Sequence, residues 1–397
     1  MRRCFSLLAA ALLVSCGTEP AADSTEAATI STELGAGSPR HRGVPLTVMT
    51  RNLYLGADIL RVVEAQGAEE LAMAVSEVFA MVQATDFPAR ARLIADEVAW
   101  TRPDVVGLQE VVIWRTGPGA ACAGDLTPQA TDVAYDFLEI LQGALRHRGL
   151  HYEVASEVTS LDIELCDATL QDVRYTDRDV ILVRQGLPAR DASSGTFQAA
   201  AVIPVVLDPT SDPPLILEIP APRGWNAVEV KRHGRWVRVV ETHIEDVLPI
   251  EPPWLVQLAQ AGELVATIGA MAEADPLPTV LVGDFNSPAD PEFTAPTYGF
   301  LAGGQPFPDL GVPDLAPLVG IVSPFQDSWL ALRAWNPGFT WGFDEDLRGG
   351  TFTQRLDLTL GWGVMPRWTL RTGIWSRTCS GLHASDHAGV VTSFAVP

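Results

Sequence analysis

The chain has 397 residues, of which 47% are hydrophobic and 19% are charged. This balance is typical of a globular protein with a large core, and it excludes a chain that is disordered as a whole. The formal net charge is -22, which argues against a protein that holds long nucleic acids mainly through their phosphate backbone.

Residues 1–16 are typical of an export signal. Arg2 and Arg3 precede an apolar run over 5–14 that is too short to span a bilayer as a helix. The tetrapeptide 13–16, Leu-Val-Ser-Cys, resembles the lipobox of bacterial lipoproteins, in which Cys16 would carry the lipid. The alternative is an ordinary cleaved signal that happens to end near a cysteine. We therefore predict an exported protein, either a lipoprotein anchored to a membrane of the cell envelope or a secreted protein.

A polar segment separates this signal from the rest of the chain. Residues 17–43 consist mostly of small and polar residues, with Ile30 and Leu34 as the bulky aliphatic pair. Such a segment buries too little apolar surface to offset the entropy of ordering, so we expect a disordered tether. Apolar segments recur over 44–397 without a further linker. We predict one α/β domain there, with no transmembrane helix in the mature chain.

Strand and helix patterns follow one another along this predicted domain. Apolar and β-branched runs predict buried strands at 46–49, 104–108, 179–184, 279–282, 354–360 and 388–394. A hairpin of 225–231 and 235–242 is expected around the turn His233-Gly234. Helical spacing predicts helices within 58–101, broken near Pro88, over 131–147, and from Pro253 to about Ala272. Residues 288–350 are rich in Pro, Gly and aromatic residues and are expected to form a long ordered loop region.

Three cysteines lie in the predicted domain. Cys122 and Cys166 fall in the same irregular region, where they either form one disulfide in an oxidising compartment or stay apart. Cys379 is then left without a partner. The spacing of these cysteines does not resemble a zinc site.

Polar residues follow several of the predicted strands. Asp284 and Asn286 lie two residues apart after the strand 279–282, where a carboxylate can take a proton from water while an amide holds it in place. Asp386 and His387 lie at the edge of the last strand. Either pair alone is more often a turn cap or a structural contact, so it is the combination that indicates a site.

Seven segments, in this order, resemble the endonuclease/exonuclease/phosphatase superfamily, which includes DNase I, AP endonucleases, sphingomyelinases and inositol polyphosphate phosphatases. They are Arg51-Asn52-Leu53, Val106-Gly107-Leu108-Gln109-Glu110, Arg178-Asp179-Val180-Ile181-Leu182, Thr242-His243, Gly283-Asp284-Phe285-Asn286, Arg355-Leu356-Asp357 and Ser385-Asp386-His387. The resemblance runs from about residue 46 to the C-terminus. It implies a four-layer α/β/β/α sandwich of two packed mixed sheets, with an active site at one end of the sheets.

The resemblance also implies a role for each motif residue. Glu110 would be the principal ligand of Mg²⁺ or Mn²⁺, and Asn52 would contact metal, water or phosphate. Asp284 would orient and deprotonate the attacking water, and Asn286 would hold Asp284 and the phosphate. His387 would donate to a phosphoryl oxygen as charge builds in the transition state.

Four further residues complete the implied site. His243 resembles the second histidine of the nuclease and sphingomyelinase branches, and Asp386 would contact metal or the surroundings of His387. Asp357 would orient one of the two histidines, without the sequence deciding which. Either Asp177 or Asp179 resembles the acidic partner of the other histidine. The structural alternatives are a buried strand histidine at position 243, a salt bridge between positions 355 and 357, and capping roles at positions 52 and 110.

The predicted function is metal-dependent hydrolysis of a phosphate ester outside the cytoplasm, on a substrate that is either a lipid headgroup or a nucleic acid. A sphingomyelinase-like phosphodiesterase and a DNase I-like nuclease are the two enzymatic alternatives, and a non-catalytic surface binding protein is the third. The nuclease is favoured by a basic hairpin with tryptophans, made of Arg223, Lys231, Arg232, Arg235, Arg238, Trp225 and Trp236. The alternation of outward positions favours the alternative, which is a simple solvated face. A lipid substrate would be favoured by an apolar rim from Trp254, Phe307, Phe325 or Trp335. No protein partner is implied.

Overall fold

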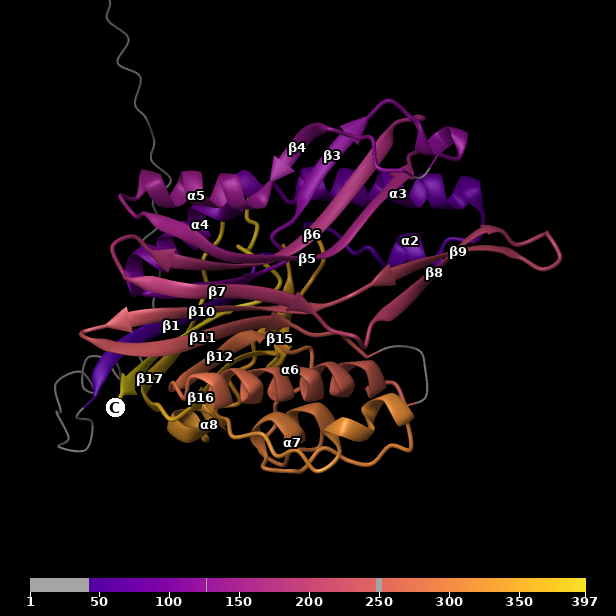
Figure 1. The fold of residues 1–397 in the computed structure, drawn as a ribbon. Coiled ribbons are helices and arrows are strands. Elements are labelled where there is room, and N and C mark those ends of the chain that lie inside the picture. Colours follow the sequence, from indigo (N-terminus) through magenta and orange to yellow (C-terminus); the bar gives the residue numbers. More distant parts are fainter. Residues whose placement is uncertain (1–42, 126, 248–251) are drawn as a thin grey trace, which may run out of the picture. The chain divides into compact units, whose positions relative to one another are not determined.

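Two β-sheets packed face to face organise the chain (Figure 1). The structure is a computed structural model, and it describes residues 43–125, 127–247 and 252–397. These residues fall within the unit Ser38–Pro397. The predicted export signal, with Cys16, and the predicted tether up to residue 42 lie outside the described residues.

The first sheet has the strand order β17-β18-β1-β2-β6-β3-β4, with β5 paired to β6. Its strands are β1 (Val44–Asn52), β2 (Val105–Gln109), β3 (Ile113–Gly117), β4 (Asp132–Asp136), β5 (Tyr152–Cys166), β6 (Asp172–Arg184), β17 (Met365–Thr372) and β18 (Gly389–Val396). β1 and β2 are parallel, and parallel neighbours need a long crossover. The crossover contains α2 (Leu60–Glu64), α3 (Ala68–Ala84) and α4 (Phe87–Thr101).

The second sheet has the order β13-β16-β12-β11-β10-β7. Its strands are β7 (Ala189–Thr196), β10 (Gly224–Arg232), β11 (Arg235–His243), β12 (Thr279–Asp284), β13 (Gln326–Asp327) and β16 (Asp357–Trp362). The long helix α6 (Leu255–Ala274) connects the parallel strands β11 and β12. Two separate hairpins complete the strands: β8 (Ala201–Asp208) with β9 (Leu215–Ala221), and β14 (Trp341–Phe343) with β15 (Gly350–Gln354).

The interface between the sheets is an aliphatic layer. Val48 and Val105 of the first sheet and Val239 and Val280 of the second belong to one cluster of buried residues. Gly107 lets the sheets approach closely, because a Cβ built there would lie 2.6 Å from the side chain of Glu241. Burial of such side chains from water is the main stabilising contribution to a fold of this kind.

Helices cover both outer faces of the paired sheets. Figure 1 shows α3, α4 and α5 (Phe137–His147) on the outer side of the first sheet, and α6 and α7 (Pro296–Ala302) on the outer side of the second. α6 is long and apolar enough to cross a membrane, yet its buried residues, including Leu258 and Leu264, pack in the core beside Leu281 of β12. The predicted four-layer α/β/β/α sandwich of two mixed sheets is confirmed.

Some predicted elements have different boundaries. The helix predicted over 131–147 begins only at Phe137, because Asp136 caps it and 132–136 pair with β3 as a strand. The strand predicted at 179–184 is the end of the longer β6. The strand predicted over 354–360 is two strands, since β15 ends at Gln354 and β16 begins at Asp357. Pairing between distant segments decided these boundaries.

The region 288–350 is more regular than the predicted loop. It contains α7, a 3₁₀ helix over Pro313–Leu318 and α8 (Ser328–Arg333). The break predicted near Pro88 lies at Asp86, which caps α4 by accepting a hydrogen bond from the Ala89 N–H. The disulfide left open by the sequence is present between Cys122 and Cys166, and Cys379 is free and exposed.

Candidate active site

Strand register brings motif residues of both sheets to one end of the sandwich. In the second sheet His243 lies opposite Asp284, and Asp284 lies opposite Asp357, so three motif residues stand side by side across β11, β12 and β16. In the first sheet Asn52 at the end of β1 lies opposite Gln109, directly before Glu110. The hydrogen bonds of Asn52 join the two sheets.

Asp284 lies between a histidine and an asparagine from the other sheet. The Asn52 Nδ2 donates to Asp284 Oδ2 at 3.0 Å and to Glu110 Oε1 at 2.9 Å. The backbone N–H of Asn286 donates to Asp284 Oδ1 at 3.0 Å. Burial alone would raise the pKa of Asp284, but His387, His243 and these hydrogen bonds lower it below its ordinary value. Asp284 is therefore a carboxylate at neutral pH.

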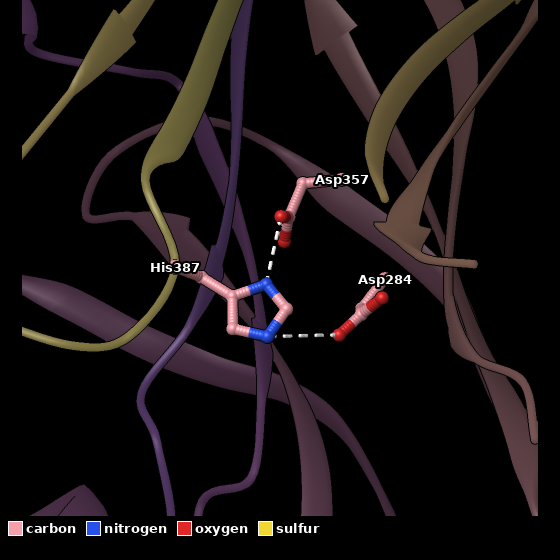
Figure 2. A group of neighbouring side chains, drawn as sticks. All are labelled: Asp284, Asp357 and His387. Carbon is pink, nitrogen blue, oxygen red and sulfur yellow. Dashed lines mark hydrogen bonds and ion pairs between the residues drawn. The ribbon is translucent and has the colours of Figure 1, made fainter. Parts of the chain in front are cut away.

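His387 is held between two carboxylates (Figure 2). Its Nδ1 lies 2.8 Å from Asp357 Oδ2, and its Nε2 lies 3.6 Å from Asp284 Oδ2. Asp357 thus serves His387 rather than His243. Arg355 does not pair with Asp357, since it bonds to Asp327 at 2.6 Å.

Two opposing influences set the charge of His387. Burial lowers the pKa of the imidazole, while Asp357, Asp284 and Asp386 raise it, and the net pKa lies well above the ordinary value. The ring is therefore an imidazolium, whose Nδ1–H donates to Asp357 and whose Nε2–H faces Asp284. Asp357 keeps a net raised pKa, because burial and Asp284 outweigh the effect of His387 on it.

The second histidine has its own acidic neighbours. His243 Nδ1 lies 3.6 Å from Asp179 Oδ1 and 3.2 Å from Arg223 Nη1. Asp177 instead faces Arg223 at 3.6 Å, so Asp179 is the closer carboxylate to the histidine. Burial and then Asp179 raise the pKa of Asp177 to about 7.

The neighbours of His243 shift its pKa in opposite directions. Burial and Arg223 lower its pKa, but Asp179 and Asp284 outweigh them and the net pKa is raised. The Arg223 guanidinium beside Nδ1 only donates, and so does the Asn286 Nδ2, which lies 3.2 Å from Nε2. These two neighbours therefore favour opposite tautomers of the neutral ring. The Asn286 Nδ2 also donates to the Ile244 carbonyl at 3.0 Å.

Glu110 and Asp386 form the acidic side of the site. Glu110 follows β2 with a positive φ of 55°, an uncommon conformation for a side-chain-bearing residue that clusters at functional sites. Its Oε2 accepts the backbone N–H of Leu55 at 2.6 Å. Burial raises the pKa of Asp386 to about 6; His387 opposes the rise and Glu110 adds to it. The two carboxylates therefore repel one another.

This acidic side fits a divalent cation. Within the described ranges, neither Glu110 nor Asp386 forms an ion pair with Lys or Arg, and hard carboxylate oxygens suit Mg²⁺ or Mn²⁺. Ligand atoms of Asp284, Asp357 and His387 also lie within 4.8 Å of one another. That group is already joined by a histidine-carboxylate hydrogen bond, so Glu110 and Asp386 are the better candidates for metal ligands.

Two buried arginines to which the sequence assigned no role support the site. Arg51 Nη1 donates to the His387 carbonyl at 2.5 Å, and its Nη2 pairs with Glu97 at 3.1 Å. Arg90 Nη1 donates to the carbonyls of Leu53 and Ala384. The arginines thus tie the loop after β1 to the segment before β18. Nothing in their spacing pointed to this role, since their partners lie far away along the chain.

A four-layer sandwich with carboxylates and imidazoles at one end of its sheets is the arrangement of a phosphoesterase. The model of the Endonuclease/Exonuclease/phosphatase family matches residues 81–387, and the chain belongs to this family. Its members hydrolyse phosphate esters. No curated protein matches the chain significantly.

The chain is also similar to solved structures at low identity. TDP2 from C. elegans is 18% identical, with 94% of this chain and 82% of that chain covered and a TM-score of 0.49. The human Nocturnin catalytic domain with bound sulfate is 18% identical, with 89% and 95% covered and a TM-score of 0.47. A mannosyl-6-phosphatase from Bacteroides thetaiotaomicron is 16% identical, with 88% and 99% covered and a TM-score of 0.46.

Proposed function

We propose that this protein is a divalent-metal-dependent phosphodiesterase that cleaves its substrate by direct in-line attack of water. The proposal rests on one observation above the others: the buried Asp284 carboxylate faces two histidines, with His387 Nε2 at 3.6 Å and His243 Nε2 at 3.8 Å. A base and two proton donors thus surround one space, as displacement at phosphorus requires.

Each side chain has a distinct task in this mechanism. Asp284, with its lowered pKa, accepts a proton from the attacking water while Asn286 and Asn52 hold its oxygens. His387 donates from Nε2 to a non-bridging oxygen as negative charge builds.

His243 completes the reaction on the other side of the phosphorus atom. It donates its Nε2 proton to the departing oxygen, which leaves as an alcohol, and Asp179 stabilises the ring while it is charged. When bound by Glu110 and Asp386, Mg²⁺ or Mn²⁺ supplies neutralisation of charge on the phosphoryl oxygens. No covalent intermediate is needed.

The basic hairpin gives little support to the nuclease alternative. β10 and β11 pair Gly224 with His243 at one end and Arg232 with Arg235 at the other, so most of these bases lie roughly 25 Å from the site at about 3.3 Å per residue. Arg238 is buried against Glu229. The favoured substrate is therefore a phosphodiester of a small molecule or of a lipid headgroup.

The apolar rim expected for a lipid substrate is only partly present. Phe307 and Phe325 are buried in the core that packs α6 and α7 on the second sheet, so they are not rim residues. Trp254 is partly buried against the same core, and Trp335 is 73% exposed.

We also propose that the enzyme acts outside the cytoplasm and is anchored to a membrane by a lipid on Cys16. Support comes from the signal-like N-terminus and the lipobox-like tetrapeptide. Metabolic labelling of cells with a fatty acid tests this: the full chain should become labelled and Cys16→Ser should not. Labelling of both proteins, or of neither, would contradict the proposed lipidation of Cys16.

The function is tested with two chromogenic esters. Bis(p-nitrophenyl) phosphate should be hydrolysed with Mg²⁺ or Mn²⁺ and not with EDTA, and p-nitrophenyl phosphate should be the poorer substrate. A preference for the monoester would make the protein a phosphatase. Absence of hydrolysis of both esters under all metal conditions would favour a non-catalytic binding protein.

A further inference from the structure

An apolar cavity lies beside the site, between the hairpin of β8 and β9, the helices α2 and α3, and the first sheet. Its volume is about 70 Å³. Its lining residues are aliphatic except for Trp114 and Tyr175. A volume of this size has room for several methylene groups rather than for a whole small molecule, and a cavity without polar partners does not hold ordered water well.

The cavity shares a wall with the catalytic residues. Trp114 of β3 lies opposite Tyr175 of β6, with ring centroids 4.9 Å apart. The Trp114 Nε1–H donates to the Leu55 carbonyl, and the Leu55 N–H donates to Glu110. One residue thus separates the ring that lines the cavity from the candidate metal ligand.

Tyr175 makes a second connection to the site. It precedes Asp177 by two residues, so alternation along the strand places both on one face of β6. Burial, and then the nearby Asp177 and Glu110 carboxylates, raise the pKa of the Tyr175 hydroxyl. The cavity is therefore lined by a residue on the same strand face as Asp177.

The hairpin that closes the cavity has an apolar outer face as well. β8 and β9 pair with neither main sheet, and in Figure 1 they extend beyond the ends of both. Ile203 and Ile219, which face each other in the register, line the cavity. On the outside, Val202, Leu215 and Ile216 are 56%, 55% and 46% exposed. An apolar hairpin on a protein with net charge -22 is suited to an uncharged, apolar surface rather than to a polyanion.

We propose that this cavity is the subsite for an aliphatic chain of the substrate, so that the enzyme cleaves phosphodiesters of lipids or lipid-like alcohols. The inference rests on the proposed phosphodiesterase function and names its substrate class. The alkyl chain packs on Trp114 and Tyr175 in the cavity. The phosphate then lies at Asp284 and His387.

The test uses diesters that differ only in chain length. Methyl, butyl and octyl p-nitrophenyl phosphates are compared at concentrations where each is monomeric, so that binding to aggregates does not contribute. kcat/KM should rise about 100-fold from methyl to octyl, or roughly 2.7 kcal/mol, which three to four methylenes supply at ~0.8 kcal/mol each.

A filling variant and a matched control locate the effect. Val205, which is 1% exposed, lines the cavity, and Val205→Phe should abolish the preference for octyl while leaving methyl ester hydrolysis unchanged. Val202→Phe, three residues away on the exposed face of the same strand, should keep the preference. If Val205→Phe does not fold, Ile219→Trp from the partner strand fills the same space.

The outcomes separate the inference from the function it rests on. Hydrolysis of the methyl ester with no dependence of kcat/KM on chain length would overturn the subsite and leave the phosphodiesterase standing. Failure to hydrolyse any ester would remove the proposed function. Calorimetric titration with octyl phosphate then tests binding in the cavity independently of hydrolysis. Binding to wild type and not to the filled variant supports the subsite, and equal or absent binding refutes it.

Discussion

Replacement of Asp284 by Asn tests the centre of the proposed mechanism with little change in volume. The side chain is 1% exposed, and both of its oxygens accept hydrogen bonds, from Asn52 Nδ2 and from the Asn286 N–H. An amide NH₂ at either oxygen position would face a donor. One of the two hydrogen bonds is therefore lost in either orientation, at a cost of about 1–3 kcal/mol in the free energy of unfolding.

The catalytic loss should be larger than the structural one. The amide cannot accept the proton of the attacking water, and positioned general bases contribute roughly 10²–10⁴-fold. The negative charge that faces His387 and His243 is lost as well, at 3.6 Å and 3.8 Å. We expect kcat to fall by at least about 10³-fold, since the base and its effect on two proton donors are removed together.

Steady-state hydrolysis of bis(p-nitrophenyl) phosphate measures kcat, and urea unfolding measures the free energy of unfolding. Asp314→Asn, at an exposed position of the 3₁₀ helix over Pro313–Leu318, is the matched control and should leave both unchanged. If folded Asp284→Asn keeps kcat within tenfold of wild type, Asp284 is not the base, and the proposed order of proton transfers is wrong.

Three further changes test other parts of the molecule. Glu110→Gln should raise the Mg²⁺ concentration for half-maximal activity at least about tenfold, because it removes a charged ligand; an unchanged metal titration would place the metal elsewhere. His383 stacks on Phe343, and burial lowers its pKa from 6.5 to about 4, so its neutral form favours the folded state. The contribution of the neutral His383 ring to stability is then fully present above pH 6.5 and declines as the pH falls towards 4. Thermal unfolding of His383→Phe should show a smaller decline over this range. Identical pH profiles for the variant and the wild type would contradict this. Loss of the Cys122–Cys166 disulfide, which closes a separation of 44 residues, should lower the free energy of unfolding by up to about 4 kcal/mol in Cys122→Ser, measured by denaturant unfolding without reductant; a change below about 1 kcal/mol would mean that the denatured state gains little freedom.

Local sequence was sufficient wherever the relevant contact lies within one strand or turn. The strand before Asp284 was recognisable because three aliphatic residues precede Gly283, and its polar end follows directly. The β10–β11 hairpin was recognisable from its turn dipeptide and the apolar runs on both sides. The helix predicted from residue 131 failed at its start, because 132–136 satisfy their backbone groups on β3 rather than within a helix.

By itself, the sequence was enough to predict the family and, through that resemblance, the two-sheet architecture, because the motifs occur in the family's order. Apolar periodicity predicted the strands at whose ends polar side chains gather. The tertiary structure alone decided that Asp357 serves His387, that Asp179 rather than Asp177 lies nearer His243, and that Trp114 and Tyr175 line an apolar cavity. These facts depend on which strands become neighbours across the sheets, and on how side chains from distant segments pack. Composition and spacing along one chain carry no record of such distances.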